Sequence, residues 1–438
     1  LFDPVPDKSL DLNFFRSLVT KLKEEAPQLS QFFSTIDQQI VSKVSLEEIK
    51  SASQALCLDN LVSLQTKKSL KTLQKDDVLA NEYAGVVTIL LKNYQEWNWP
   101  ENMSLKLLNN RSSKWRVFVE EDVLNALFLQ VVGVRFGSKL KSTMNSTFIR
   151  FKPYPQYDLQ KCDYYRHQHV VALYSTALPS SFTDSSVGSY DSSPSPKGMS
   201  MKQKLLQLLA TETKCARELN TPLVLVSADI ENFYLSIPHQ VLLVILEEFG
   251  CPDTWITFIK KFLTPNVTLK EENFEKTGRL SRGVPTGHSL SKFLHEILLL
   301  LGDYHSSFKS DVIFTRNFDD YYFWSQDAKV VEECWKNMTE FLGKAALNFN
   351  PKKSGHFVLN HKKDSKSKLP IGDVKYGFLV LDSNGNFVAD NESVNKMKEI
   401  MEKRLSSTSS LLSWIRIYNT FLKYIFRSLG DSCNGILY

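Results

Sequence analysis

Cysteine is sparse in this chain of 438 residues, and no Cys-x-x-Cys pair occurs. The six cysteines are widely separated: Cys57, Cys162, Cys215, Cys251, Cys334 and Cys433. Such scatter excludes a disulfide-rich secreted scaffold and indicates reduced thiols in an intracellular protein. A secretory signal is also lacking, as is any uninterrupted apolar run of about 18 residues, so no membrane span is expected.

A strong excess of either charge is absent as well, since 53 basic residues stand against 48 acidic ones, for a net charge of +5. This mild bias permits a nucleic-acid partner but does not by itself argue for one. Cys162, His167 and His169 have a loosely zinc-like spacing, but no fourth ligand lies nearby and no zinc site is expected. Hydrophobic residues make up 42% of the chain, which is enough for a large packed core.

The first half of the sequence reads mainly as helix. Apolar residues recur every three or four positions over residues 13–95, and Asp122 to Gly133 and 201–219 are also helical in pattern. Short runs typical of strands occur at 115–119, 147–152 and 170–174. After these runs, residues 176–199 are rich in Ser, Pro and Asp and predict a flexible surface loop.

From residue 222 onward the pattern is that of a compact α+β unit. Residues 222–228 are apolar throughout, as expected of a strand buried on both faces. The elements expected after it are a helix at 239–249, a loop and short hairpin to 282, a helix at 289–301, strand-turn-strand at 311–324, a helix at 328–346, a strand at 376–380 and helix over 393–428. This order predicts a split βαβ sheet packed on helices.

Three aspartates stand out by their position. Asp229 follows the buried strand, and Asp319 and Asp320 lie at the turn of the predicted hairpin. Carboxylates gathered at one end of a sheet repel one another unless a dication neutralises them, and hard oxygen ligands are those Mg²⁺ prefers. Two such ions are the usual device for in-line phosphoryl displacement. Asp-Asp is also a common turn dipeptide, so the pattern alone is not specific.

Five segments together resemble the motifs of reverse transcriptases, over roughly residues 200–438. They are Asp229 to Tyr234 followed by Ser236-Ile237-Pro238, then Gly283 to Ser291, Asn317 to Asp320, Leu347 to Ser354, and Tyr376 to Leu379. The first three are specific in combination, whereas the last two are weak individually. Within the family, the sequence resembles the reverse transcriptases of host genes or defence systems more than the retroviral type.

The resemblance implies roles for single residues. Asp229, Asp319 and Asp320 would bind two Mg²⁺ ions, or Mn²⁺ in their place, with the backbone carbonyl of Ile230 assisting. Tyr234 would be an aromatic gate that clashes with a ribose 2′-hydroxyl, although simple core packing is the alternative. The other implied roles are a proton donor or neutralising charge at Lys353, support of the incoming nucleotide by Gly283, Pro285, Thr286 and Gly287, and a primer grip at Gly377, Phe378 and Leu379.

Departures from the family pattern concern residues beside the metal ligands. Thr286 replaces the usual glutamine and is followed by His288, and Asn317 replaces the usual tyrosine. These replacements remove no metal ligand, so they could alter the fidelity or nucleotide choice of the enzyme, not its ability to bind metal. The basic residues that contact the triphosphate cannot be aligned uniquely. The candidates are Arg150 and Lys152, expected on one strand, and also Arg166 and Arg116.

The implied architecture is a right hand with four parts. They are a helical N-terminal extension over 1–110, fingers over 111–221, a palm over 222–385 and a helical thumb over 386–438, either short or truncated. The apolar stripe of the thumb helix (Trp414, Ile415, Ile417, Tyr418, Phe421, Leu422 and Phe426) is expected in the core, while Arg404, Arg416, Lys423 and Arg427 face nucleic acid. The lysines of 362–368 fit either a phosphate contact or a solvated loop.

The reaction implied is RNA-directed DNA synthesis, with an RNA template, a DNA or RNA primer and deoxynucleoside triphosphates as partners. A template-independent or protein-primed DNA-synthesising defence protein is the second interpretation. A catalytically dead RNA-binding scaffold is the third, although a scaffold has no need of three mutually repelling carboxylates. A viral RNA-dependent RNA polymerase is the weakest, because Tyr234 stands where a small residue or Asp is expected. No recognisable RNase H, integrase or endonuclease region follows the expected thumb, so self-contained retroelement mobility is not expected.

Overall fold

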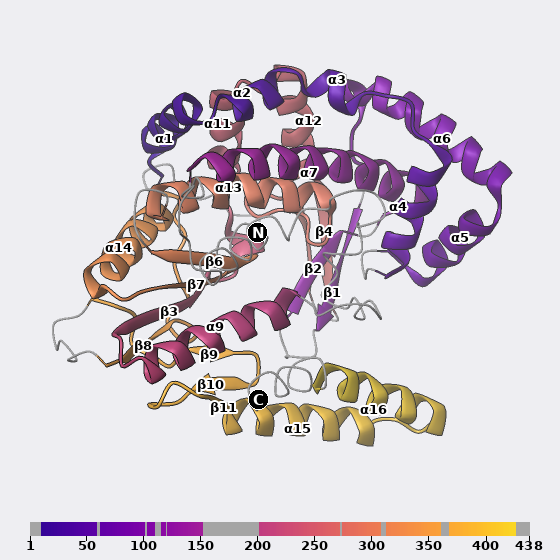
Figure 1. Cartoon of the computed structure of the whole chain (residues 1–438). Helices are drawn as coiled ribbons and strands as arrows, with labels where there is room; N and C mark the ends of the chain where they lie inside the picture. Colours follow the sequence, from indigo (N-terminus) through magenta and orange to yellow (C-terminus); the bar gives the residue numbers. More distant parts are fainter. Residues whose placement is uncertain are drawn as a thin grey trace.

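The computed structural model describes residues 10–58, 62–100, 103–109, 115–119, 121–151, 201–271, 274–307, 312–360 and 368–425. The predicted serine-rich loop at 176–199, the β-like run at 170–174 and the loosely zinc-like group at 162–169 lie outside these residues. Figure 1 shows a curved arrangement, with the N-terminal helices on the outside of the fold and the C-terminal helices at the opposite side.

The N-terminal part is helical, as predicted for residues 13–95. Its elements are α1 (Leu12–Glu25), α2 (Pro27–Ser34), α3 (Ile36–Ile40), α4 (Leu46–Leu58), α5 (Leu64–Lys75), α6 (Asp77–Lys92) and the short 3-10 helix η2 (Tyr94–Glu96). Capping side chains mark several of the starts, since Asp11, Ser63 and Asp76 each accept backbone N–H groups of the following turn. The buried Arg135 fixes α4 by pairing with Glu48 at 2.9 Å and donating to the carbonyl of Ile40 at 2.7 Å.

A long apolar helix, α7 (Val123–Phe151), runs beside α13 (Ser289–Ser307) through the middle of the molecule (Figure 1). The sequence predicted that this helix ends at Gly133, but it continues to Phe151. The strand predicted at 147–152 is therefore wrong, because residues 147–151 are the last turns of α7. Thr147, Phe148 and Ile149 have only a weak intrinsic preference for strands. The earlier turns of α7 are already held by packing, and adding further turns to an existing helix outweighs that preference. The segment Val123–Met144 is long and apolar enough to cross a bilayer, but 72% of it is buried inside the fold, as in a core helix.

The central sheet has the strand order β6-β7-β3-β8, and all neighbours are antiparallel. Its strands are β3 (Leu223–Asp229), β6 (Ile313–Asn317), β7 (Asp320–Ser325) and β8 (Gly355–Leu359). Every residue of β3 is buried, which confirms the prediction from its apolar sequence. The helices α9 (Met201–Glu218), α10 (Phe233–Ser236), α11 (His239–Phe249) and α14 (Ala328–Lys344) complete this part.

The segment predicted as a loop and hairpin to 282 contains an additional helix, α12 (Asp253–Leu263). Its apolar positions Trp255, Phe258, Ile259 and Phe262 are buried and follow helical spacing after Pro252, so the signal was present in the sequence. The expected hairpin follows as β4 (Asn266–Glu271) and β5 (Phe274–Arg279). It joins β1 (Met103–Asn109) and β2 (Trp115–Val119) in a sheet of order β2-β1-β4-β5, in which β1 and β4 are parallel.

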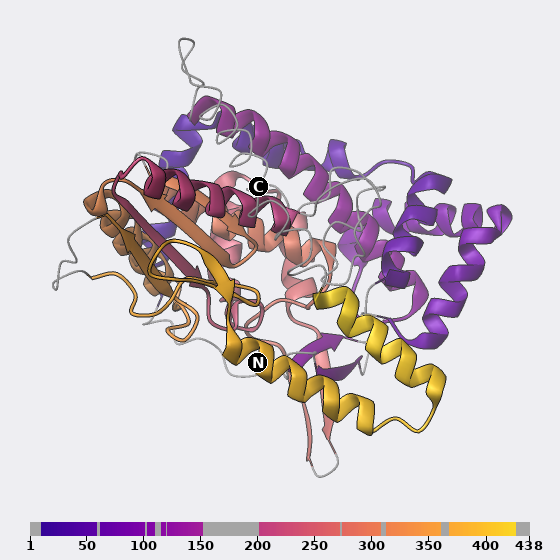
Figure 2. The same cartoon turned by 60° about the horizontal axis from the view of Figure 1, so that its bottom comes forward.

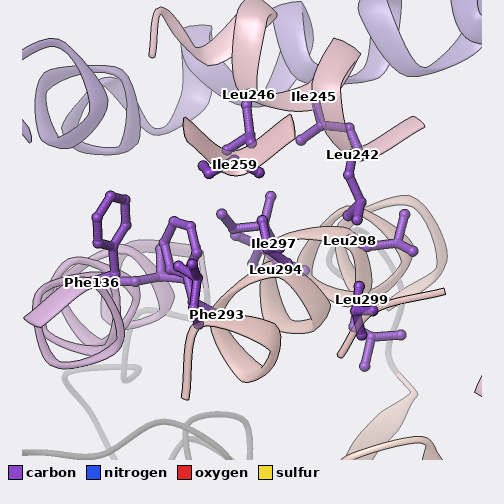
Figure 3. Close-up of a cluster of buried hydrophobic side chains, with 14 of the residues drawn as sticks. Phe136, Leu242, Ile245, Leu246, Ile259, Phe293, Leu294, Ile297, Leu298 and Leu299 are labelled. Atoms are coloured by element: carbon purple, nitrogen blue, oxygen red, sulfur yellow. The ribbon is translucent and has the colours of Figure 1, made fainter. Parts of the chain in front are cut away.

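The main hydrophobic core lies where α7, α11, α12 and α13 meet. Figure 3 shows Phe136 of α7 and Phe293 of α13 facing each other below the leucines and isoleucines of α11 and α12. Their rings are close to perpendicular, with centroids 4.8 Å apart. The core therefore holds α13, which carries the second motif at its start, against two elements from different parts of the chain.

A small third sheet, β11-β10-β9, leads into the C-terminal helices. Its strands are β9 (Lys375–Tyr376), β10 (Leu379–Leu381) and β11 (Phe387–Ala389). The continuous strand predicted at 376–380 is wrong, since Leu379 pairs back on Tyr376 across a tight turn whose Gly377 has φ +62°. The predicted helix over 393–428 is two helices, α15 (Asn391–Ser406) and α16 (Leu411–Ile425), which project together in Figure 2. The serines and threonine of residues 406–410 explain the break, because they favour caps over helix interiors.

Candidate active site

Strand register brings the aspartates of the first and third motifs together. Asp229, the last residue of β3, lies directly opposite Asp320, the first residue of β7. Asp319 sits in the two-residue connection between β6 and β7, where its carbonyl accepts the backbone N–H of Ile230 at 3.3 Å. The predicted grouping of Asp229, Ile230, Asp319 and Asp320 at one end of the sheet is thus present in the backbone.

The β6–β7 connection is conformationally strained. Phe318, a bulky residue with φ +59°, occupies the left-handed region that glycine usually fills. Such strain persists only where the surroundings fix the backbone. Phe318 is half-buried, and its carbonyl lies 3.5 Å from a guanidinium nitrogen of Arg316. The strained residue directly precedes Asp319, so it sets where that aspartate points.

A buried ion triad anchors this connection from behind. Arg316 of β6 donates through both terminal nitrogens to Glu296 of α13, at 2.7 and 2.9 Å, and through Nε to Asp303 at 2.8 Å. The three side chains are at most 1% exposed. Such a bidentate arrangement in the interior is geometrically specific, because each unmet partner would leave a buried charge.

The buried helix α13 carries two groups with displaced pKa values. Burial raises the pKa of Asp303 to about 7, although the neighbouring Arg316 opposes the shift. Burial lowers the pKa of His295 to about 3, and the positive charges of Lys292 and Arg316 add to the effect. The side chain of His295 is therefore neutral at neutral pH.

These two shifts have opposite consequences for stability. A raised pKa at Asp303 means that its contribution is full near pH 4 and is lost as pH rises toward 7, whereas the contribution of His295 is full above pH 6.5 and is lost as pH falls. We expect the two slopes to cancel between pH 4.5 and 6.5. Asp303→Asn removes one slope, so its free energy of unfolding should fall by about 1.4 kcal/mol for each pH unit below 6.5, relative to wild type. Urea titrations across this range measure it, and parallel wild-type and variant curves would contradict the assignment.

Lys353 reaches the carboxylate of Asp229. Its Nζ lies 2.6 Å from Oδ1 of Asp229, whose side chain is 12% exposed, while the lysine side chain is 40% exposed. The backbone of the fourth motif is fixed to the same strand, since the N–H of Asn350 donates to the carbonyl of Asp229 at 2.7 Å. A positive charge therefore stands where the chemistry of the aspartates calls for one.

The carboxylate oxygens of Asp229, Asp319 and Asp320 are the hard donors that a divalent cation prefers, and one of them already binds the ammonium of Lys353. Within the described ranges, no three acidic, histidine or cysteine side chains are arranged closely enough to hold a metal ion. The carboxylates of Asp229, Asp319 and Asp320 would therefore have to turn toward one another to share an ion. Burial raises the pKa of Tyr321 and of Tyr322, and the charge of nearby aspartates adds to the shift, so both tyrosines stay neutral beside Asp320.

The second motif is joined to the first through the backbone. The N–H of Gly283 donates to the carbonyl of Ile237 at 2.8 Å, and that of Val284 donates to the carbonyl of Tyr234 at 2.9 Å. Gly283 has φ +77°, and a Cβ there would lie 2.9 Å from the backbone of Leu235, so glycine is required. Thr286 and Gly287 follow half-buried, and Gly287 has φ +94°.

Comparison with known proteins agrees with this geometry. The sequence model of the family described as reverse transcriptase (RNA-dependent DNA polymerase) matches residues 166–384, which is half of the chain.

The chain belongs to the reverse transcriptase family.

Its activity is accordingly that of a nucleotidyltransferase, and its fold is of the right-hand polymerase class.

Among solved structures, the chain is similar to an apo telomerase from Candida tropicalis truncated from its C-terminal domain, with 12% identity and a TM-score of 0.41. That match covers 74% of this chain and 69% of the other. A telomerase from Candida albicans in complex with a fragment of telomeric RNA gives 13% identity and a TM-score of 0.40, over 82% of this chain and 60% of that one. The chain thus spans less than two thirds of the second protein. No curated protein matches the sequence.

The residues predicted to form a primer grip, Gly377, Phe378 and Leu379, occupy a turn that packs against the C-terminal helices. Phe378 is 8% exposed and forms a small cluster with Met397 of α15 and Phe421 of α16. Leu379 faces a different cluster on the palm side. The apolar stripe of α16 is only partly in the core, because Trp414, Ile415 and Tyr418 are 36–42% exposed while Phe421 is buried.

The described part of the chain does not test the prediction that basic residues contact the triphosphate. Arg150 lies near the end of α7, not on a strand, and Lys152 and Arg166 lie outside the described ranges. Arg116 is on β2. Most of the lysine-rich run at 362–368 and Arg427 also lie outside these ranges. Their roles stay predictions.

Several residues that shape the site were missed at the level of sequence. The most informative are Lys292, His295 and Glu296, charged or polar positions inside the apolar run 289–301. Polar side chains within a buried helix need partners, so their presence was a usable signal. His288 is another, since its Nε2 lies 2.6 Å from Oε1 of Glu121, which joins the second motif to the start of α7 with both side chains at most 4% exposed.

Proposed function

We propose that this reverse transcriptase extends a primer along an RNA template with deoxynucleoside triphosphates, using Asp229, Asp319 and Asp320 to hold two Mg²⁺ ions. The observation that carries the proposal is the register of β3 and β7, which sets Asp229 opposite Asp320 and next to Asp319. The positively charged Nζ of Lys353 on Asp229 supports it, because a cation is already stable there. The four-part division into N-terminal extension, fingers, palm and thumb is part of the proposal.

The reaction forms a bond between the primer 3′-oxygen and the α-phosphorus and breaks the bond from that phosphorus to pyrophosphate. When bound, the two Mg²⁺ ions supply charge neutralisation at the attacking and leaving oxygens. Lys353, within reach of Asp229, neutralises pyrophosphate or gives it a proton. The loop from Gly283 to Gly287 supports the incoming nucleotide, and the ring of Tyr234 excludes a ribose 2′-hydroxyl.

Primer extension tests the proposal directly. An RNA template with a DNA primer is supplied with dNTPs or NTPs and with Mg²⁺ or Mn²⁺, and the wild type is compared with a variant carrying Asp319→Asn and Asp320→Asn. Template-matched DNA made by the wild type and lost in the variant is the expected result. The pair Glu392→Gln and Glu402→Gln, exposed acidic residues on α15, is a matched control that removes the same charge elsewhere.

Other outcomes separate the alternatives. DNA made without template, or found covalently attached to the purified protein, would contradict templated extension and indicate a protein-primed or template-independent enzyme. RNA binding without any product, equal in wild type and variant, would indicate a scaffold.

Replacing Lys353 tests its part in this reaction. We expect Lys353→Met to lower kcat by about 10²-fold, a usual size for the loss of a general acid, with little change in the KM for dNTP. Lys353→Arg should keep the charge and recover part of the rate. Rapid-quench measurement of single nucleotide addition gives both constants. If Lys352→Met, one position away on an exposed side chain, lowers kcat equally, Lys353 has no special role.

A further inference from the structure

One face of α13 lies directly behind the proposed sugar gate and the catalytic turn. Lys292, His295 and Glu296 are spaced by three and four residues, so they share a face of the helix. They line a small pocket with Phe233 and Tyr234 of the first motif and Phe318 of the third. A single helical turn therefore contacts the gate and the residue before Asp319.

The contact between His295 and Tyr234 is close and specific in geometry. Their ring centroids are 4.0 Å apart and the rings are perpendicular at 88°, while Phe233 flanks the same histidine at 5.0 Å. His295 is 3% exposed, whereas Tyr234 is half-buried, so the histidine is the more enclosed of the two rings and forms a wall against the tyrosine. Edge-to-face aromatic pairs of this kind hold a preferred orientation.

The backbone of Tyr234 is already fixed, so only its side chain can change position. Its carbonyl accepts the N–H of Val284 at 2.9 Å, and Gly283 on the same loop is bound to Ile237. Where the ring sits is therefore decided by what packs against it. Among the described residues, His295 is the aromatic neighbour nearest to Tyr234, and its Nε2 has no hydrogen-bond partner there. A buried nitrogen without a partner is costly, so what His295 contributes here is the shape of its ring and not a hydrogen bond from Nε2.

We propose that His295 is a positioning residue that sets the ring of Tyr234 and thereby determines discrimination between deoxyribonucleotides and ribonucleotides. The inference rests on the proposed function of Tyr234 as the sugar gate. Because the pKa of His295 is lowered to about 3, its ring is neutral and acts as a planar wall in aromatic contact with Tyr234. Removing the wall lets the tyrosine ring retreat, which makes room for a 2′-hydroxyl.

The test measures kcat/KM for dCTP and for CTP opposite a template guanine, with the full chain. His295→Ala is expected to lower the dCTP preference by about tenfold, the size of one packing contact in a selective pocket, mainly through improved use of CTP. His295→Phe, which keeps an aromatic ring without the unpartnered nitrogen, should retain the wild-type preference. His295→Leu is a second truncation in case the alanine variant does not fold.

A double-mutant cycle distinguishes positioning from general damage. Tyr234→Ala should abolish the preference, and His295→Ala added to it should change nothing further, because there is no ring left to place. His305→Ala, on the same helix and packed against Phe14 at 5.2 Å, is the matched control and should leave the preference unchanged.

Three results would overturn the inference. They are an unchanged preference in both His295→Ala and His295→Leu, an equal loss in His305→Ala, and a loss that persists in the Tyr234→Ala background. If Tyr234→Ala lowers the preference while His295→Ala does not, only the role of His295 fails. If the wild type adds neither nucleotide, the proposed function fails, and the inference fails with it.

Discussion

Replacing Gly133 with alanine is expected to destabilise the protein severely. A Cβ at this position would lie 2.2 Å from the backbone nitrogen of Leu290 and 2.6 Å from the carbonyl carbon of Ser289. Both atoms belong to the backbone at the start of α13, so no side chain can rotate away to make room. The helices would have to separate, and overpacking of this kind costs on the order of 3 kcal/mol or more. Chemical denaturation followed by circular dichroism measures the change.

Two other helical glycines provide matched controls. A Cβ added at Gly85 on α6 or at Gly343 on α14 would meet no other atom within 4 Å. Gly85→Ala and Gly343→Ala should therefore raise stability, by about 0.5–1 kcal/mol, because alanine loses less backbone entropy in a helix. Gly133→Ala with wild-type stability would show that α7 and α13 are not held this closely. Because α13 begins with the second motif, any residual folded variant should also have lost nucleotide addition.

Breaking the bidentate pair behind the catalytic turn is the second change with a large expected effect. Glu296→Gln keeps the shape of the side chain but removes the bidentate carboxylate of Arg316, which then has Asp303 as its remaining buried acidic partner on α13. Loss of one partner of a buried pair costs about 3–5 kcal/mol. The strained backbone at Phe318 would also lose support, so activity should fall more than stability alone predicts at temperatures where the variant is folded.

Asp303→Asn is the matched comparison, because Asp303 contacts the same arginine through one bond of 2.8 Å and has a pKa raised to about 7. Because Asp303 is already about half protonated at pH 7, replacing it with a neutral side chain removes less charge–charge attraction to Arg316. We therefore expect Asp303→Asn to lower the free energy of unfolding by less than half as much as Glu296→Gln at pH 7. Thermal unfolding monitored for both variants, beside single-turnover rates at a temperature where each is folded, provides the comparison. Equal losses of stability would mean that the charge of Arg316 is shared evenly between the two carboxylates.

The predictions that succeeded rest on strong local patterns. The uniformly apolar sequence before Asp229 and the strand-turn-strand around Asp319 each allow one structure, and antiparallel pairing then places the aspartates together. The helical N-terminal region also follows from its spacing and capping residues. These patterns depend on neighbours in sequence, so no tertiary information was needed.

The predictions that failed depend on partners far away in the chain. Gly133 reads as a helix end, but the approach of α13 is what requires it. Thr147 to Phe151 have strand-forming side chains, yet they continue a helix whose earlier turns are buried. The tight turn at Gly377 likewise goes with the packing of Phe378 against α15 and α16. The role of Glu296 and His295 needed the position of β6 and of Tyr234, which no local pattern contains.

The cluster of Phe378, Met397 and Phe421 has a mechanical consequence. The turn at Gly377 is bonded to the start of α15, since the N–H of Asp390 donates to the carbonyl of Phe378 at 2.8 Å and Lys375 pairs with Asp390 at 3.0 Å. The two C-terminal helices and this turn are therefore joined by side-chain packing, a backbone hydrogen bond and an ion pair. We expect a displacement of α15 or α16 to be passed to the turn through these contacts.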